Sequence, residues 1–344
     1  MPIRRHLPFR IVFIWLSLML VATRAVAADA ALIEAAKREG QVVWYTSQII
    51  DPLVLRLQDA FKKKYGIEVK PVRANSAEIA LRILNEARGG RTIADIYGGQ
   101  TTSEALKKEG LALKWLPDNI KDISPDFLDP DGYWMGTNFT LMTAAFNTDL
   151  IKPGSEPKTW EDLLAPSLTG KMLWSGAVST SAGAGFVGLV LKQMGEEKGI
   201  PYLRKLAGQK IATTGGSARQ VIDMAIAGEY AMALQIFPEH AAASSAKGAP
   251  VKWIPMRPGM ASVISTSGIT AGAPHMNAAK LFMEYMISEE GQIVFRDSLY
   301  SPIHPKVAPI DTEFAPNANP YIVLTPREAF EQMPRWMAVF KELF

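Results

Sequence analysis

Short apolar runs alternate with longer amphipathic segments in the first third of the chain. Residues 42–46 (VVWYT) have the β-branched and aromatic character of a buried strand, and residues 51–65 place Leu53, Leu57 and Phe61 on one helical face. Further strands are expected at 67–72 and 94–97, and further helices at 31–37, 76–88 and 103–109. This strand–helix order predicts a mostly parallel sheet with helices on both faces.

A second strand–helix series lies between two extended stretches, residues 133–146 and 263–271. Its strands are expected at 171–174, 210–213, 230–235 and 251–255, and its helices at 186–194, 200–206, 217–227 and 240–246. Two α/β series joined by two extended crossings predict two lobes that share a hinge. We assign residues 28–140 to the first part of lobe 1, 141–262 to lobe 2, and 263–344, with the C-terminal helices, to the second part of lobe 1.

The first 27 residues have the pattern of a secretory signal peptide. Arg4, Arg5 and Arg10 precede an apolar run over residues 11–22, and the small residues Ala25-Val26-Ala27 follow it. The run is shorter than the roughly 20 residues that span a bilayer. We therefore expect cleavage near Ala27, a periplasmic location, and no membrane-spanning segment afterwards; an uncut N-terminal anchor is the alternative.

Size, charge and cysteine content narrow the possible functions. The chain has 344 residues, and single cores stop growing at roughly 250–300 residues, which again favours two lobes. Four of its 37 basic residues are arginines in the signal peptide, which leaves 33 against 34 acidic residues. We expect no nucleic-acid partner, because no basic block remains to contact phosphates. The absence of cysteine excludes disulfides, thiolate metal sites and a cysteine nucleophile.

Several segments, in order, resemble the extracellular solute-binding proteins of bacterial ABC importers. The resemblance rests on VVWYTSQ, LQDAFKKKYGIEVKPVRANSAEIALRILNEA, IADIYGG, FNTDLIKPGSEPKTWEDLLAPSLTGKM, AIAGEYAMAL, AKGAPVKWIPM and ITAGAPHMNAAKLFMEYMISEEGQ. The group it resembles includes binders of ferric iron, 2-aminoethylphosphonate, thiamine and polyamines. The resemblance implies a type II periplasmic-binding fold, a monomer that closes on a small-molecule ligand without a cofactor, and docking to an ABC permease in the inner membrane.

Hydroxyl, amide and glycine residues gather in five predicted strand-to-helix turns. Helix N-termini in such turns offer free N–H groups and a positive dipole end, which favour carboxylate, phosphonate or phosphate oxygens. Each of these side chains also suits an ordinary helix cap. With residues at the first crossing and after the 230–235 strand, the candidate ligand-binding residues are Thr46, Ser47, Gln48, Asn75, Ser76, Gly99, Gln100, Thr137, Ser179, Thr180, Ser181, Ser217, Arg219, Gln235 and Phe237. Of these, Ser76 is a plausible cap and Arg219 a possible cationic clamp.

The residues after the 230–235 strand bear on whether the ligand is a metal. In ferric binders of the resembled group, adjacent tyrosines stand there, whereas this chain has Ile236-Phe237-Pro238. Glu239 and His240 follow, and one such pair is a weak metal signal. We therefore expect an organic, anionic ligand and no metal site, with ferric iron as the alternative.

Other function classes have less support. The chain has no G-x-S-x-G turn, no phosphate-loop lysine motif and no H-E-x-x-H motif, so we expect a binding protein rather than an enzyme. A binding protein that reports its ligand to a membrane receptor is a further alternative, and the sequence does not distinguish it from a transport protein.

Overall fold

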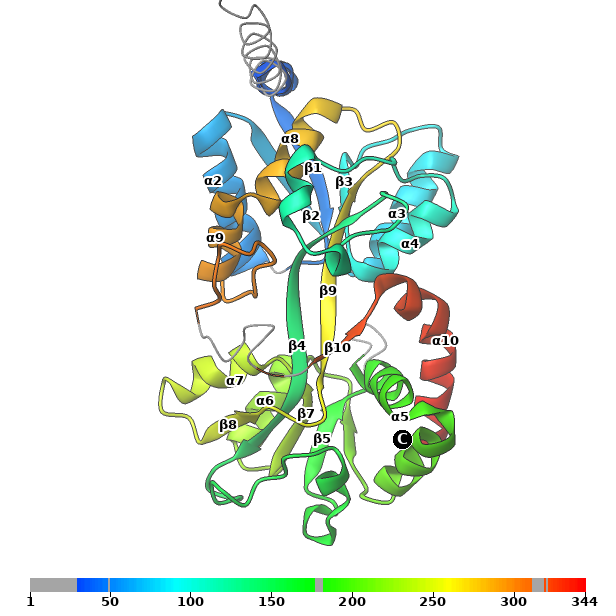
Figure 1. The fold of residues 1–344 in the computed structure, drawn as a ribbon, viewed down its shortest axis with the longest axis vertical. Helices are drawn as coiled ribbons and strands as arrows, with labels where there is room; N and C mark the ends of the chain where they lie inside the picture. The colour runs from blue at the N-terminus through cyan, green and yellow to red at the C-terminus, as the bar shows by residue number, and fades with distance from the viewer. Residues whose placement is uncertain (1–29, 49, 177–181, 311–318, 320) are drawn as a thin grey trace, which may run out of the picture.

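One long strand, β4 (Met135–Asn147), runs through both halves of the protein. The computed structural model describes residues 30–48, 50–176, 182–310, 319 and 321–344. As far as Met142, β4 pairs antiparallel with β9 (Met260–Ile269); beyond it, β4 pairs with β7 (Met232–Ile236) and β8 (Val251–Ile254). Figure 1 shows β4 and β9 side by side between an upper and a lower lobe. They correspond to the two predicted crossings, and the mixed α/β architecture is confirmed.

The upper lobe is built on three parallel strands. These are β1 (Gln41–Thr46), β2 (Glu68–Arg73) and β3 (Ile96–Gly98), with β1 in the middle. Its helices are residues 30–39, the π-turn η1 (Ile50–Val54) with α2 (Leu55–Tyr65), α3 (Ser76–Arg88), α4 (Gln100–Lys108), α8 (Met276–Ile287) and α9 (Glu289–Asp297). Two 3₁₀ turns, η2 (Asp118–Asp122) and η3 (Pro125–Phe127), precede β4. These elements follow the predicted strand–helix order closely.

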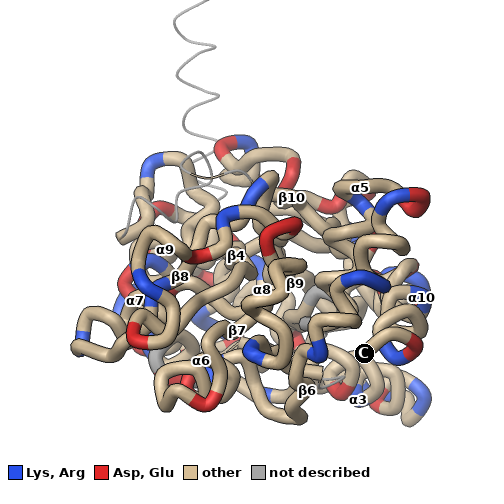
Figure 2. The backbone as a smooth tube through the Cα atoms, turned by 90° about the horizontal axis from the view of Figure 1, so that it is seen from below, with Lys and Arg blue, Asp and Glu red and all other residues tan. Residues whose placement is uncertain are grey.

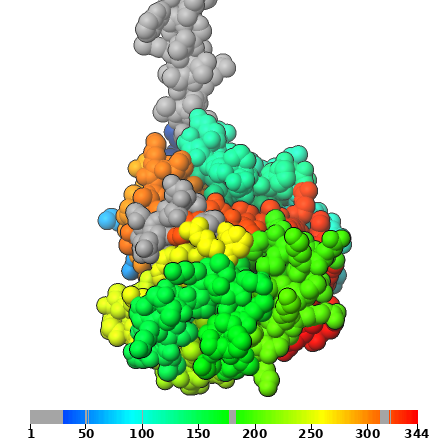
Figure 3. Space-filling model, turned by 60° about the horizontal axis from the view of Figure 1, so that its bottom comes forward, coloured from blue at the N-terminus to red at the C-terminus, as the bar shows by residue number. Residues whose placement is uncertain are grey.

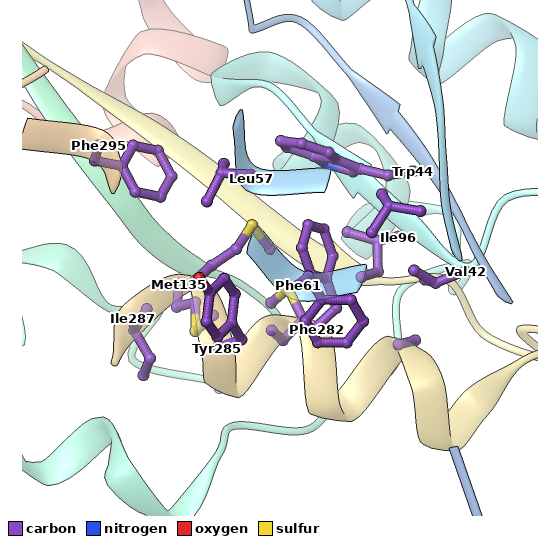
Figure 4. Packing of buried hydrophobic residues seen from close by; sticks show 14 of the residues in the cluster. Val42, Trp44, Leu57, Phe61, Ile96, Met135, Phe282, Tyr285, Ile287 and Phe295 are labelled. Atoms are coloured by element: carbon purple, nitrogen blue, oxygen red, sulfur yellow. The ribbon is translucent and has the colours of Figure 1, made fainter. Parts of the chain in front are cut away.

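Aromatic side chains fill the core of the upper lobe. The apolar face of α2 buries Phe61 against Phe282 of α8, with ring centroids 4.8 Å apart, and Trp44 of β1 meets the same Phe282 ring edge at 5.4 Å. Figure 4 shows these side chains converging between α2, α8 and the sheet. Edge-to-face pairs of this kind add about 0.5–1.5 kcal/mol each beyond their burial.

The lower lobe repeats the arrangement with β5 (Met172–Ser175), β6 (Ala212–Thr214) and β7. Its elements are η4 (Glu161–Leu164), η5 (Pro166–Leu168), α5 (Ala182–Ala207), α6 (Ala218–Ile226) and α7 (Pro238–Ser245). α5 covers the two helices predicted at 186–194 and 200–206. The chain bends between them at Gly195, whose φ of 70° is a left-handed value that suits glycine.

The C-terminal helix α10 (Pro326–Leu343) departs from the expected assignment of residues 263–344 to the first lobe. It packs along α5, and its Trp336 and Phe340 belong to the same buried cluster as Trp174 of β5. This packing of α10 on α5 is possible because glycines near the start of α5 leave room for these two rings. Figure 3 shows the orange-red C-terminal segment between teal residues of the first lobe and green residues of α5. The other lobe boundaries remain a prediction.

A short strand, β10 (Tyr321–Leu324), precedes α10 and was not predicted from the proline-rich tail. It pairs in parallel with the start of β9, from Met260 to Val263. β10 therefore adds a third strand next to the two crossing strands. Within the described part of the chain, no helix has the length and apolar character needed to cross a membrane.

Candidate site at the junction between the lobes

The carboxyl ends of the two parallel strand sets point toward one another. β9 runs from the lower lobe to the upper one, and β3 is antiparallel to it, so β1, β2 and β3 run toward the lower lobe. β4 opposes β9, and β7 opposes β4, so β5, β6 and β7 run toward the upper lobe. The turns after these six strands therefore face the junction between the lobes, which is where open α/β sheets bind ligands.

At the end of β1, the structure brings several predicted residues together. The Gln48 side-chain amide donates to Asn138 Oδ1 of β4 at 2.8 Å, and the Gln48 backbone N–H donates to Thr46 Oγ1 at 3.1 Å. The adjacent Thr137 hydroxyl donates to the Ser265 carbonyl of β9 at 3.3 Å. Ser47 lies in the same turn and is half-buried. Asn138 was missed, although an amide side chain within the predicted crossing, next to Thr137, is a signal for it.

The N-termini of α3 and α4 lie in contact with each other. Asn75, rather than Ser76, caps α3, in a capping box with Glu78. The Ser76 carbonyl accepts from the Thr102 hydroxyl of α4 at 2.7 Å. Gly99 just before α4 has φ of 122°, and a Cβ there would lie 2.5 Å from Ser76 Oγ, so only glycine fits. Gln100 is the first residue of α4, so the free N–H groups of both helices start at this place.

In the lower lobe, two predicted residues have structural partners. Ser217 caps α6, and its hydroxyl accepts from the Gln220 backbone N–H. The Gln220 side-chain oxygen accepts from the Ser217 backbone N–H in turn. Arg219 pairs with Asp223 at 2.6 Å and donates to Ser244 Oγ of α7 at 3.0 Å. Both arrangements lie within the lower lobe. A ligand would have to compete with Asp223 and Ser244 for the Arg219 guanidinium.

Gln235, the residue before the last of β7, has no such partner. Its φ of 54° is left-handed, and its side chain is 1% exposed. Neither polar atom of its amide has a hydrogen-bond partner among the described residues. The pairing of β7 with β4 shifts register here, between Thr143 and Ala144. A buried amide without partners costs free energy, and strained backbone of this kind is typical of functional sites.

The turn after Gln235 leads into α7 with aromatic and ionisable residues. Phe237 precedes α7, and its ring meets that of His240 edge-on, with centroids 5.5 Å apart. Burial raises the pKa of Glu239 to about 8. Burial also lowers the pKa of His240, and the nearby Arg219 adds to that effect. Around these residues and elsewhere in the described chain, no three His, Asp or Glu side chains are grouped to hold a metal ion.

Three predicted residues, Ser179, Thr180 and Ser181, lie outside the described residues. The Ser175 hydroxyl at the end of β5 donates to the Gly216 carbonyl after β6 at 2.6 Å, so the ends of these two strands are joined.

Comparison with known proteins supports this reading of the fold. Residues 56–320 match the family model described as bacterial extracellular solute-binding protein. The chain is 21% identical over 302 residues to the Fe(3+)-binding periplasmic protein of Serratia marcescens, which covers 83% of this chain and 87% of that protein.

Two solved structures share the fold at low identity. Iron-bound HitA from Pseudomonas aeruginosa is 22% identical, with a TM-score of 0.73 over 88% of this chain and 99% of HitA. The periplasmic binding protein AfuA from Actinobacillus pleuropneumoniae, solved with fructose-6-phosphate, is 22% identical with a TM-score of 0.74 over the same shares. The type II periplasmic-binding fold of these proteins is the fold of this chain.

Proposed function

This chain belongs to the bacterial extracellular solute-binding proteins of ABC importers, and we propose that it captures a small organic anion between its two lobes. In this proposal the chain works in the periplasm after cleavage near Ala27. Ligand contacts to both lobes favour the closed arrangement, which an ABC permease then recognises. The family consists of binding proteins, and no chemical step is part of the proposal.

The observation that carries the proposal is the unpartnered amide of Gln235, which lies near the carboxyl end of β7, the end that is directed toward the upper lobe. An amide offers two donors and an acceptor, which suits hydroxyl or carboxylate groups of an organic solute. The paired starts of α3 and α4 offer backbone N–H groups, which suit anionic oxygens. A ligand with a carboxylate or phosphate group would satisfy both sets.

Ferric iron is the second candidate, because proteins similar to this chain bind it. The Serratia marcescens relative is named for Fe(3+), and HitA was solved with iron. Phenolate oxygens suit a hard trivalent cation, but Phe237 stands after β7 where the resembled ferric binders have tyrosine. AfuA, with its sugar phosphate, shows that the fold also accepts an organic anion.

A thermal-shift screen tests the proposal. A ligand that binds only the folded protein stabilises it by about 2.7 kcal/mol at a hundred times its Kd. We expect a sugar phosphate, phosphonate or carboxylate to raise the melting temperature, and Gln235→Ala to reduce that shift. Gln193→Ala, on α5, is the matched control. A shift with ferric citrate alone, and with none of the organic anions, would contradict the proposal and favour iron.

A further inference from the structure

A separate cavity lies between α7 of the lower lobe and the segment after α9 of the upper lobe. Its volume is about 270 Å³, just below the 300–1,000 Å³ that is usual for ligand pockets. Ala242 and Ala243 of α7 form one wall, and Leu299 and Ile310 form the other. Figure 1 shows α7 at the lower left with the orange segment after α9 above it. The cavity therefore suits a small molecule with an apolar body.

The cavity also has polar lining residues, and these come from both lobes. Glu239 belongs to α7, while Tyr300 and Ser301 belong to the segment after α9. Among the described residues, no Lys or Arg pairs with Glu239. Arg296 also lines the cavity, but it pairs with its neighbour Asp297 at 2.8 Å. Glu239 therefore lines the cavity without an ion-pair partner among the described residues.

The opposite wall carries strain and exposed apolar surface. Leu299 has φ of 68°, which is left-handed and unfavourable for a leucine. Leu299 and Ile310 are 48% and 60% exposed, two of the most exposed large apolar residues in the described chain. An occupant with an alkyl chain would cover this surface.

We propose that this cavity binds a small alkylammonium ion, with the ammonium group on the Glu239 carboxylate and the alkyl chain between the alanines of α7 and Leu299. The ammonium donates to Glu239, and Tyr300 and Ser301 supply further oxygens beside it. Because the walls belong to different lobes, an occupant favours the lobe arrangement seen here. Glu239 follows the junction turn after β7, but the other lining residues lie outside the junction turns, so the inference does not depend on which solute those turns bind.

Protonation provides an independent signature of the site. Burial raises the pKa of Glu239 to about 8, and burial, with a smaller contribution from the Glu239 charge, raises the pKa of Tyr300 to about 12. His240 is the adjacent titratable group on α7, and Arg296 is the charged group on the opposite segment. An ammonium ion requires the ionised carboxylate, so its binding at pH 7 releases a proton from Glu239. Binding at pH 9.5 releases none, because Glu239 is then already ionised.

Isothermal titration with n-pentylammonium chloride tests the inference in the full chain without its signal peptide. We expect binding to the wild type, and a loss of at least ~10-fold in affinity in Glu239→Gln and for the neutral isostere n-pentanol. Glu229→Gln removes an exposed carboxylate elsewhere on the lower lobe and is the matched control. Ala243→Leu fills the cavity and should also weaken binding, with the melting temperature confirming that each variant folds.

Proton release is measured from the same titrations in buffers of different ionisation enthalpy. Release near one proton at pH 7, lost in Glu239→Gln, supports the assignment. Equal affinity of the wild type and Glu239→Gln for n-pentylammonium, or an equal loss in Glu229→Gln, overturns it. The absence of measurable binding to the wild type at pH 9.5 overturns it as well.

Discussion

At the scale of single residues, the candidate site is marked by polar groups that the fold has buried without satisfying. Gln235 is the strongest case, since a left-handed backbone and an unpartnered amide occur at the same residue. Asn138 also has a buried amide nitrogen without a partner in the described chain, although its oxygen accepts from Gln48. Such groups are costly in an empty protein, which is why they indicate a ligand or ordered water.

Glu239 leads to a prediction about pH and stability. Its pKa rises from 4.5 in the unfolded chain to about 8 in the folded protein, so the folded state binds more protons between these values. The contribution of the protonated Glu239 to the free energy of unfolding is therefore fully present below pH 4.5. It is lost as the pH rises to 8. Relative to wild type, Glu239→Gln should gain stability from pH 5 to pH 8, on the order of 2–4 kcal/mol.

Urea unfolding at several pH values measures this difference. Glu229→Gln serves as the control, because Glu229 is exposed and its removal should leave the pH profile parallel to that of wild type. Parallel profiles for Glu239→Gln and wild type would show that Glu239 is solvated in the folded protein.

The sequence located the starts of helices more reliably than it assigned roles to individual side chains. The turn at residues 75–76 was identified, but Asn75 rather than Ser76 caps α3, because the cap depends on which residue leaves helical φ and ψ. Arg219 was considered as a cationic clamp, yet Asp223, one turn along α6, already binds it. A carboxylate four residues away was visible in the sequence and favours such a pair.

At the scale of helices and strands, α10 shows where the sequence stops being informative. C-terminal helices were expected from the sequence, and in α10 Trp336 and Phe340 are buried. The sequence does not show which surface receives the helix. That depends on α5, where Gly183 and Gly188 leave space for the rings of Phe340 and Trp336. β10 was missed because the tail around it is rich in proline, which argues against a strand.

The packing of α10 on α5 predicts opposite effects of two similar substitutions. A Cβ at Gly188 would lie 2.7 Å from the Trp336 ring, whereas a Cβ at Gly185 would have no neighbour within 4 Å. Gly188→Ala should therefore destabilise the protein by about 1–3 kcal/mol through overpacking. Gly185→Ala should stabilise it by up to about 1 kcal/mol, because alanine favours the helix.

Thermal and urea unfolding of the two variants provide the comparison. If Gly188→Ala proved as stable as Gly185→Ala, Trp336 would not be seated against this part of α5. A double variant adding Trp336→Ala should relieve the clash, and so reduce the cost of the alanine at position 188.

At the scale of the whole molecule, charges of both signs are dispersed over the surface rather than gathered on one face. Figure 2 shows basic and acidic residues interspersed around the lower lobe. The ion pair considered below joins α10 to the first lobe. Two lobes joined by crossing strands were predictable from the alternation of elements. The ion pairs between the lobes were not, because they join residues far apart in sequence.

One such contact ties α10 to the first lobe. Arg327 pairs with Asp131 at 2.8 Å, and Lys107 of α4 pairs with Asp131 and with the buried Asp129. The helix packs mainly on α5, through Trp336 and Phe340, and it also contacts α4 of the first lobe. A change in the angle between the lobes should therefore strain the contacts of α10 with the first lobe, the Arg327 pair among them.

Removing that pair should alter the distribution of distances between the lobes. Because the chain has no cysteine, Leu81 and Leu150, which are 56% and 54% exposed on different lobes, can be replaced by cysteine and spin-labelled. In the ligand-free protein, Arg327→Ala should broaden the label-to-label distribution toward longer distances, since it releases one tie between the lobes. Arg335→Ala removes a similar pair, with Glu196 at 2.5 Å, that lies wholly between α10 and α5. Arg335→Ala should leave the distribution unchanged. If Arg327→Ala also left it unchanged, α10 would not restrain the hinge.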